Sequence, residues 1–236
     1  MNAILRRIKH DLQRGLQRLS TPLEKKVGKH VIRKKIELFK TDQRTLDLGC
    51  GQSPSAPFFP NRIGVDIAWA PGIDVIADAH HLPFAAASFK QIVCSEVLEH
   101  LPHTQKSIEE MVRVLDRGGR VIVTAPFIFP VHEAPDDYQR FTEFGLKHLF
   151  TSSGFSVEKV EALYTEEQTL AILLQRIAYQ RQDSLLRRYS YLLLAHFIFR
   201  FSRSNALRYQ DIERRTPGPF MTAGYLLVAY KPDSNG

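Results

Sequence analysis

The chain has 236 residues, of which 44% are hydrophobic and 24% charged, and its formal net charge is +7. This length and composition predict one large domain, or one domain with an appendage, and they exclude a disordered, collagen-like or disulfide-stapled protein. The two cysteines are too few for a disulfide framework, so we expect reduced thiols and a cytoplasmic location. The longest apolar stretch, residues 189–201, is too short to span a membrane.

Basic residues flank an acidic middle. Residues 1–40 hold twelve Lys or Arg and three Asp or Glu, whereas residues 41–170 hold ten and eighteen, and residues 171–215 hold nine and three. A protein that coats nucleic acid would be basic over most of its length. The charge distribution therefore argues against a nucleic-acid partner.

The first 40 residues predict two basic helices. In residues 3–20, leucine and isoleucine recur at helical spacing and arginines occupy the opposite side. Thr21 and Glu24 then form a capping-box pattern around Pro22, which starts a second helix that runs to about Lys40. Two interpretations are open: solvated helices that pack on the domain, or a segment that binds an anionic membrane surface.

From Arg44 onward, short apolar runs alternate with helical segments, which predicts a mainly parallel sheet with helices on its faces. The first clear helix is expected to end at Gly118 and Gly119, and the second at Gly154. The predicted strands are 44–48, 62–66, 74–77, 91–95, 120–125, 155–163 and 224–231, and the predicted helices are 104–115 and 142–153.

About sixty residues separate the last two predicted strands. They are basic and rich in Leu, Tyr, Phe and Arg, and a structureless loop of that length would be unusual, so we expect an inserted helical subdomain. Two interpretations are open here as well. The helices form either a lid with a core of its own, or an apolar acceptor pocket or membrane-facing patch.

A glycine-rich turn directly follows the first strand, in the sequence TLDLGCG. Such glycines let the backbone approach a ligand and present N–H groups to it. The dinucleotide fingerprint is incomplete, because Pro54 stands at its last glycine position. Acidic residues follow the next three strands, namely Asp66, Asp78 and Glu96. Because the carboxyl ends of parallel strands share one edge of a sheet, this pattern predicts a binding site, with Asp66 suited to the ribose hydroxyls of an adenosine.

The segments LDLGCG, GVDI, ADAHHLPF, SFKQIVCSEVLEHL and MVRVLDRGGRVIVTAPF resemble the successive motifs of class I S-adenosylmethionine-dependent methyltransferases. The resemblance covers about Arg44 to Leu163 and implies a Rossmann-like, mostly parallel sheet of seven strands whose last strand is antiparallel. The continuation HEAPDDYQRFTEFGLKHLFTSSGF resembles a bacterial subgroup often of unassigned substrate, with some members near glycan and lipid biosynthesis. We predict N-terminal helices in residues 1–40, the core in 41–163, a helical insertion in 164–223, and the last strand and tail in 224–236.

The resemblance also implies S-adenosylmethionine as the cofactor. The residues implied in binding it are Asp47, Gly49, Cys50, Gly51, Asp66, Ile67, Asp78, Ala79, Ser95 and Glu96. The first four would hold the amino-acid end, the next two the ribose and adenine, and the next two the adenine edge and face. The last two would line the pocket below the methionine portion. Two departures, Ser53 in place of a third glycine and a short connection to the second strand, predict a cofactor that is more exposed there or covered by the N-terminal helices.

Methyl transfer requires the acceptor atom in line with the methyl–sulfur bond, and an oxygen acceptor of high pKa also requires a general base. The loop after the fifth strand leaves the edge where an acceptor would stand. His132 is the predicted base because its unperturbed pKa lies near neutrality, with Glu133 beside it. In the alternative interpretation, His132 and Arg140 only hold the loop together. His100 is a weaker candidate for the base, because it fits the start of a helix turn beneath the site. No Cys or His spacing predicts a metal ion.

We therefore predict a methyltransferase that acts on a small-molecule, glycan or lipid-linked acceptor, with peripheral contact to an anionic membrane through residues 1–40 and the insertion. One alternative is a nucleic-acid methyltransferase, but the fourth strand ends in CSEV rather than in an Asn-Pro-Pro-Tyr type of sequence. The other is an inactive binding protein of the same fold. That protein would have lost the cofactor acids, whereas Asp47, Asp66 and Asp78 are all present.

Overall fold

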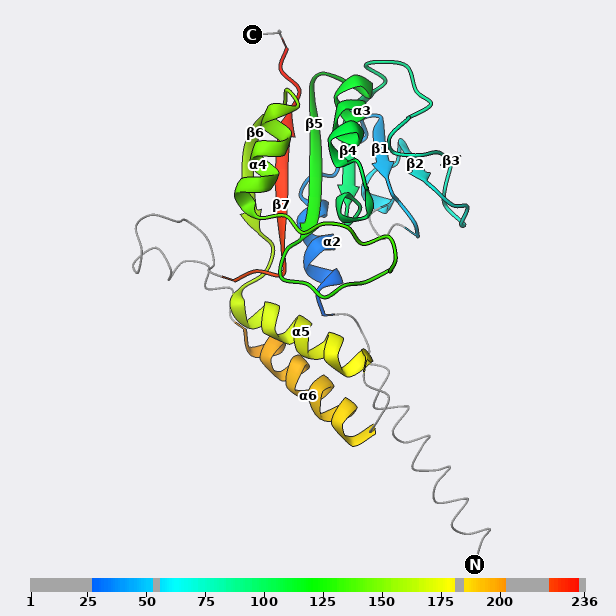
Figure 1. Ribbon diagram of the computed structural model, residues 1–236. Helices are drawn as coiled ribbons and strands as arrows, with labels where there is room; N and C mark the ends of the chain where they lie inside the picture. Colours follow the sequence, from blue (N-terminus) through cyan, green and yellow to red (C-terminus); the bar gives the residue numbers. More distant parts are fainter. Residues whose placement is uncertain (1–26, 53–55, 181–184, 203–220, 234–236) are drawn as a thin grey trace, which may run out of the picture.

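The computed structural model describes residues 27–52, 56–180, 185–202 and 221–233 (Figure 1). The helix predicted at 3–20 and the capping box of Thr21 and Glu24 lie outside these described residues. The helices are α2 (Lys29–Glu37), α3 (Thr104–Val114), α4 (Glu143–Ser152), α5 (Glu166–Gln180) and α6 (Leu185–Phe201), with short 3-10 turns η1 (Ala56–Phe58) and η2 (Leu98–His100). The strands are β1 (Thr45–Leu48), β2 (Arg62–Asp66), β3 (Val75–Ile76), β4 (Phe89–Ser95), β5 (Leu115–Pro126), β6 (Ser156–Ala162) and β7 (Gly224–Tyr230).

The seven strands form one sheet in the order β3-β2-β1-β4-β5-β7-β6. The strands from β3 to β5 pair in parallel, and β7 is antiparallel to both β5 and β6. This confirms the predicted Rossmann-like sheet with an antiparallel last strand. The strand order changes direction between β1 and β4, which is where open α/β sheets form a crevice at the carboxyl ends of their strands.

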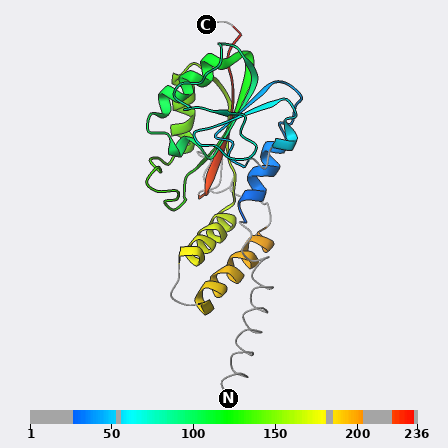
Figure 2. The ribbon, with the colours of Figure 1, turned by 90° about the vertical axis from the view of Figure 1, so that its right-hand side faces the viewer.

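Helices cover both faces of the sheet (Figure 2). Alternate residues of a strand point to opposite faces. Ile92 of β4 packs in a core with residues of α3 and α4, whereas Val93 packs in a second core with α2 and α5. β1 is buried at every residue. The central strands therefore form a rigid platform whose carboxyl ends lie at one edge of the sheet.

The helix predicted at 104–115 is present as α3, but Gly118 and Gly119 are not the residues that end it. The helix ends at Val114, and Leu115 is already extended, fully buried and paired with Phe89 of β4. The two glycines lie within β5, where backbone hydrogen bonds pair them with Lys231. Pairing with residues distant in the chain thus overrides the local glycine signal and makes β5 twelve residues long.

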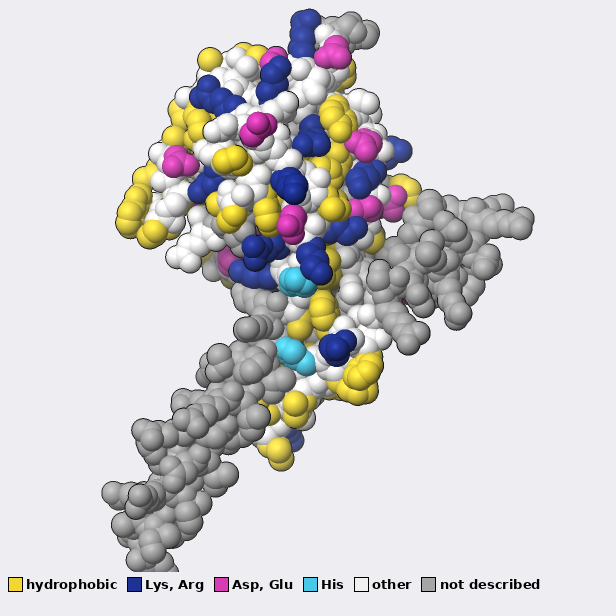
Figure 3. Space-filling view, turned by 180° about the vertical axis from the view of Figure 1, so that it is seen from behind, with side chains coloured by type: hydrophobic (Ala, Val, Ile, Leu, Met, Phe, Trp, Pro, Cys, Tyr) yellow, Lys and Arg dark blue, Asp and Glu magenta, His cyan; other side chains and the backbone are white. Residues whose placement is uncertain are grey.

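Helices α5 and α6 lie between β6 and β7 in the chain and form a hairpin below the edge where β1, β4 and β5 end (Figure 1). α5 is attached to the core, since Gln175 Oε1 accepts a hydrogen bond of 3.1 Å from the Val27 backbone N–H. α6 leaves apolar side chains exposed, and Figure 3 shows hydrophobic side chains gathered on this hairpin. None of the described helices combines the length and hydrophobicity that a membrane span needs.

Candidate functional site

Two cavities open at the carboxyl edge of the sheet. The first has a volume of about 250 Å³ and is enclosed by the ends of β1 and β4 together with α2 and α5. The second has a volume of about 560 Å³ and lies beside the end of β2 and the segment after β3. Four residues line both cavities, namely Gly49, Glu96, His100 and Glu133. The two cavities are therefore neighbouring parts of one site.

The glycine-rich turn after β1 is shaped by its contacts with β2 and β4. Gly49 has φ +64°, and a Cβ there would lie 2.2 Å from Cγ2 of Val97, so the segment after β4 packs directly on the turn. The Cys50 N–H donates to the carbonyl oxygen of Val65 at 3.0 Å. The Gly51 N–H donates to Oδ2 of Asp66 at 2.8 Å. These bonds fix the turn against the end of β2.

The structure brings Asp66 and Asp78 to the same cavity. Both line the second cavity, together with Ile67 and Ala79. The Asp66 carboxylate is oriented by the backbone N–H groups of Gly51 and Ile67, each at 2.8 Å. The His80 backbone N–H donates to Asp78 and holds the pKa of that carboxyl below its usual value.

Asp47 lines the neighbouring first cavity rather than the second. It is 3% exposed, and its Oδ2 lies 3.6 Å from a guanidinium nitrogen of Arg62. Cys50 lines the same cavity, where burial and the Asp47 charge raise the pKa of its thiol to about 11. A thiol of that pKa stays protonated near neutral pH and is a poor nucleophile. The three predicted aspartates thus surround two adjoining cavities.

Glu96 lies where the two cavities meet. Its backbone has φ +57°, a conformation that L residues rarely adopt. Burial and the nearby Glu99 carboxylate raise the pKa of Glu96 to about 7. Within the described part of the chain, its Oε1 is buried without a hydrogen-bond partner. A cationic group in the cavity would favour the ionised form of this carboxyl group.

Arg140 organises the loop after β5. Its guanidinium donates to both carboxylate oxygens of Asp137 and to the carbonyl oxygens of Phe129 and Pro130. Asp137 also accepts a hydrogen bond of 2.8 Å from the His132 backbone N–H. The Arg140 guanidinium holds the pKa of Asp137 far below its usual range. These bonds hold the loop together, as one of the two sequence interpretations expects, and they present His132 to the first cavity.

The imidazole of His132 lines the first cavity, and its side chain is 14% exposed. The Glu99 carboxylate beside it raises the pKa of this imidazole. Glu133, by contrast, has an exposed side chain at the mouth of both cavities. His100, which the sequence places beneath the site, instead ends η2 and lines both cavities. Whether His132 acts as a base remains a prediction.

The first cavity also has a basic lining, which the sequence did not predict. Lys29 and Arg33 of α2 and Arg176 of α5 contribute to its wall. The guanidinium of Arg176 lies 4.5 Å from the ring centre of Phe129, and burial lowers the pKa of Arg176. Among the described residues, no carboxylate forms an ion pair with any of these three cations. The only signal in the sequence was the positive charge of both segments, which does not show the face that each side chain occupies.

Comparison with known proteins shows that the core is similar to methyltransferases. A family model described as a methyltransferase domain matches residues 46–123. An uncharacterized protein of Methanocaldococcus jannaschii is 40% identical over 88 residues, which cover 34% of this chain and 43% of that protein. A demethylmenaquinone methyltransferase of Paenarthrobacter aurescens is 36% identical over 107 residues, which cover 39% and 42%. The chain thus spans less than half the length of these two relatives.

The fold is shared with solved structures over most of the chain. The crystal structure of the cyclase SpnF superimposes with a TM-score of 0.56 at 16% sequence identity, covering 85% of this chain and 80% of that one. At that identity the likeness concerns the fold alone. Because SpnF is described as a cyclase, the shared fold by itself does not establish the reaction.

Proposed function

The chain contains a methyltransferase domain of the class I S-adenosylmethionine-dependent family, and on that premise we propose that it methylates a small-molecule acceptor that carries an anionic group. The cofactor of this family, S-adenosylmethionine, supplies a methyl group activated by its bond to a sulfonium centre. The observation that carries the proposal is the meeting of the glycine turn, the oriented Asp66 carboxylate and the half-buried Glu96 at two adjoining cavities.

The second cavity suits the adenosine half of the cofactor. The Asp66 carboxylate, already oriented by two backbone N–H groups, retains acceptor capacity for the ribose hydroxyls. Ile67 and Ala79 offer apolar contacts for the adenine, and Asp78 offers an acceptor for its amino group. A volume of about 560 Å³ lies within the usual range of small-ligand pockets.

The first cavity suits the methionine half and the acceptor. We assign the amino-acid end to Asp47, Gly49 and Cys50, with Ser95 and Glu96 below the sulfonium. Gly51 lines neither cavity, and its N–H donates to Asp66 instead. Glu96 and Asp47 would stabilise the cationic part of the cofactor by charge. α2 and α5 cover this cavity and would keep water from the reacting atoms.

The acceptor atom would lie beside His132 and Glu133, which line the first cavity from the loop after β5. What the chain contributes there is mainly position, because transfer requires an in-line approach at about 3–3.5 Å. The Tyr164 hydroxyl donates to the Gly28 carbonyl oxygen at 3.2 Å and so fixes the start of α2 against the segment that precedes α5. This contact would set the width of the acceptor site.

The basic lining favours an anionic acceptor. Lys29, Arg33 and Arg176 line a cavity of about 250 Å³, and none of them forms an ion pair with a carboxylate of the described residues. Arg binds phosphate and carboxylate groups through paired hydrogen bonds. A phosphate- or carboxylate-bearing glycan, lipid-linked intermediate or small metabolite meets this requirement.

Contact with a membrane surface would bring a lipid-linked acceptor to the site. The exposed apolar residues of α6 support this proposal, and they are Leu185, Leu186, Leu193, Leu194, Phe197 and Phe201. Arg187, Arg188 and Arg200 on the same helix add the charge that anionic headgroups attract. The other two predictions, a nucleic-acid methyltransferase and an inactive binding protein, have no comparable support in the cavity.

The decisive experiment is methyl transfer from labelled S-adenosylmethionine to separated lipid, glycan, protein and RNA fractions of a cell extract. We expect label in an anionic compound of the lipid or glycan fraction or in a small metabolite. Arg176→Gln should raise the KM for that acceptor and leave the Kd for the cofactor unchanged, whereas Lys147→Gln, on the exposed face of α4, should change neither. Label confined to RNA or protein, or cofactor binding without any transfer, would overturn the proposal.

A further inference from the structure

A buried carboxylate without hydrogen bonds lies next to the first cavity. Glu99 is 0% exposed, and in the described part of the chain neither of its carboxylate oxygens accepts a hydrogen bond. An isolated buried carboxylate is costly, and proteins usually compensate such a group with a paired charge or a metal ion. Among the described residues, the only cationic partners within ion-pair distance of Glu99 are the imidazoles of His100 and His132.

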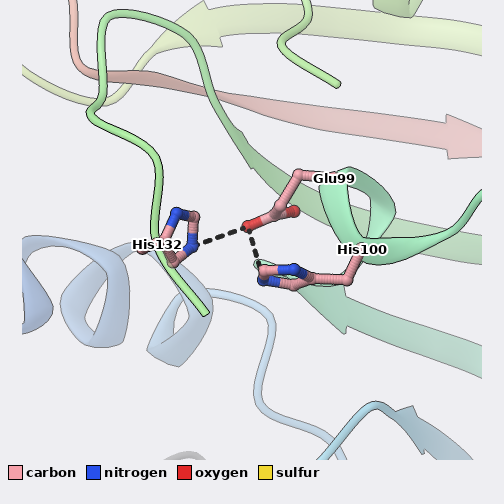
Figure 4. Close-up of side chains that lie close together, drawn as sticks. All are labelled: Glu99, His100 and His132. Atoms are coloured by element: carbon pink, nitrogen blue, oxygen red, sulfur yellow. Dashed lines mark ion pairs between the residues drawn. The ribbon is translucent and has the colours of Figure 1, made fainter. Parts of the chain in front are cut away.

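Two imidazoles face that carboxylate (Figure 4). Nε2 of His100 and Nε2 of His132 each lie 3.7 Å from the same oxygen, Oε1 of Glu99. This separation is too long for a hydrogen bond. The separation is, however, short enough for a single ion to bond to the Glu99 oxygen and to both imidazole nitrogens. Zinc bonds to nitrogen or oxygen ligands at about 2.0–2.2 Å. The three ligand atoms all lie within 4.8 Å of one another.

The opposite ring nitrogens are held by oxygen acceptors. Nδ1 of His100 contacts the carbonyl oxygen of Asp136, and Nδ1 of His132 lies 3.4 Å from Oδ2 of Asp137. A guanidinium nitrogen of Arg140 is slightly farther from the His132 ring, at 3.5 Å. Metal-binding histidines usually donate their second N–H to a carbonyl or carboxylate, which fixes the tautomer and turns the other nitrogen to the ion. His100 has this arrangement, whereas Nδ1 of His132 lies near both the Asp137 carboxylate and the Arg140 guanidinium, which can only donate to it.

We propose that Glu99, His100 and His132 bind one divalent transition-metal ion, with Zn²⁺ the best-suited, at the wall of the first cavity. Two imidazole nitrogens and a carboxylate are a ligand set of catalytic zinc sites, which keep a further position open. Mg²⁺ and Ca²⁺ prefer oxygen ligands alone. Glu133 stands beside this open position, with its Oε2 3.8 Å from Nε2 of His100 and its side chain 78% exposed. His100 and His132 line the first cavity, so a coordination position left free by the three ligands would be accessible to the acceptor that we place there.

The role of the ion rests on the proposed function, although its binding does not. A coordinated Nε2 has no lone pair left to accept a proton, so the metal site replaces the general base predicted at His132. An ion at this point would instead lower the pKa of a bound acceptor hydroxyl and orient it toward the methyl group. The spacing of Glu99, His100 and His132 in the sequence does not show this site, because the two histidines lie in different loops.

The test is calorimetric titration of the full chain, free of affinity tags and stripped of metal, with ZnCl2 alone. We expect one equivalent of Zn²⁺ to bind, and we expect Glu99→Gln, His100→Ala and His132→Ala each to raise the Kd by about 100-fold or more. His103→Ala is the matched control, because that ring lies beside His80 and does not line the first cavity, and it should leave the Kd unchanged. Co²⁺ in place of Zn²⁺ should give a visible spectrum that the three ligand variants lose.

A folding defect is separated from a lost ligand by measuring S-adenosylhomocysteine binding and circular dichroism on each variant. Glu99→Asp, which keeps the carboxylate, should retain Zn²⁺ binding that is weaker than in the unchanged chain. The proposal is overturned by the absence of stoichiometric Zn²⁺ binding to a chain that binds the nucleotide, or by binding that survives both His132→Ala and Glu99→Gln. Failure of nucleotide binding with intact Zn²⁺ binding would instead refute the proposed function alone.

Discussion

The Asp66 carboxylate offers the sharpest test of the cofactor site. Asp66→Ala removes the acceptor that we assign to the ribose hydroxyls, and it also removes the hydrogen bond of 2.8 Å from the Gly51 N–H. The substitution thus weakens the ligand contact and the anchoring of the glycine turn together. Both effects act on the cofactor and leave the buried platform of β1 and β4 intact.

The expected magnitude follows from the type of bond. A hydrogen bond to a charged group contributes about 1.5–3 kcal/mol. Water can partly replace the lost carboxylate, so the smallest expected loss of binding free energy is about 1 kcal/mol. A loss of about 1–3 kcal/mol corresponds to a roughly 5- to 150-fold rise in Kd. We expect this rise for both S-adenosylmethionine and S-adenosylhomocysteine, since both carry the same ribose.

The assay is isothermal titration calorimetry with both nucleotides and with NAD as a ligand that should not bind. Asp74→Ala is the matched control, because Asp74 also accepts a backbone hydrogen bond, of 2.7 Å from Gly64, but lines neither cavity. It should lower stability and leave the nucleotide Kd unchanged. An unaltered Kd in folded Asp66→Ala, or equal weakening in both variants, would refute the assignment of Asp66.

Three further predictions concern the turn, the pH dependence of stability and the exposed hairpin. Gly49→Ala should lower the free energy of unfolding by about 2–4 kcal/mol in urea denaturation, because L residues are strained at φ +64° and the new Cβ would lie 2.2 Å from Val97. The hydrogen bonds from Arg113 hold the pKa of Glu110 below its usual value, so their stabilisation is present above the unfolded pKa and is lost as the pH falls through the lower folded pKa. Glu110→Gln should therefore cost about 1 kcal/mol near neutral pH and almost nothing in acid, as followed by denaturation at several pH values. Phe197→Glu, on the exposed face of α6, should reduce sedimentation with anionic liposomes.

Each of these predictions has a control in the same chain. Gly154→Ala, at φ +93° but in open space, should cost less than Gly49→Ala, and equal costs would contradict the packing argument. Glu109→Gln, on the exposed side of α3, should show no such pH dependence. Phe144→Glu replaces an equally exposed ring on α4, and loss of liposome binding in this variant too would remove α6 as the contact surface.

Much of the fold could be predicted because its signals are local. The apolar runs of β1, β4 and β7 are buried on both faces of the sheet, and the amphipathic stripes of α3 and α4 pack on it, so each pattern carries the period of its element. The acids at the strand ends were found for a related reason. The carboxyl ends of parallel strands all lie at the same edge of the sheet. A residue at the end of such a strand can therefore be assigned to that edge from its place in the strand alone.

The tertiary structure decided what depends on contacts between distant segments. It placed Gly118 and Gly119 in β5 rather than at a helix end, because Leu115 pairs with Phe89 across the sheet. It also brought Arg176 to the cavity at the carboxyl edge of the sheet and placed Glu99 beside His132, although nothing in the spacing of these residues links them. Composition and periodicity determine which elements form and which face of each is buried. The neighbours of a given side chain are set by how those elements pack, and packing depends on the complementarity of whole surfaces rather than on any one segment.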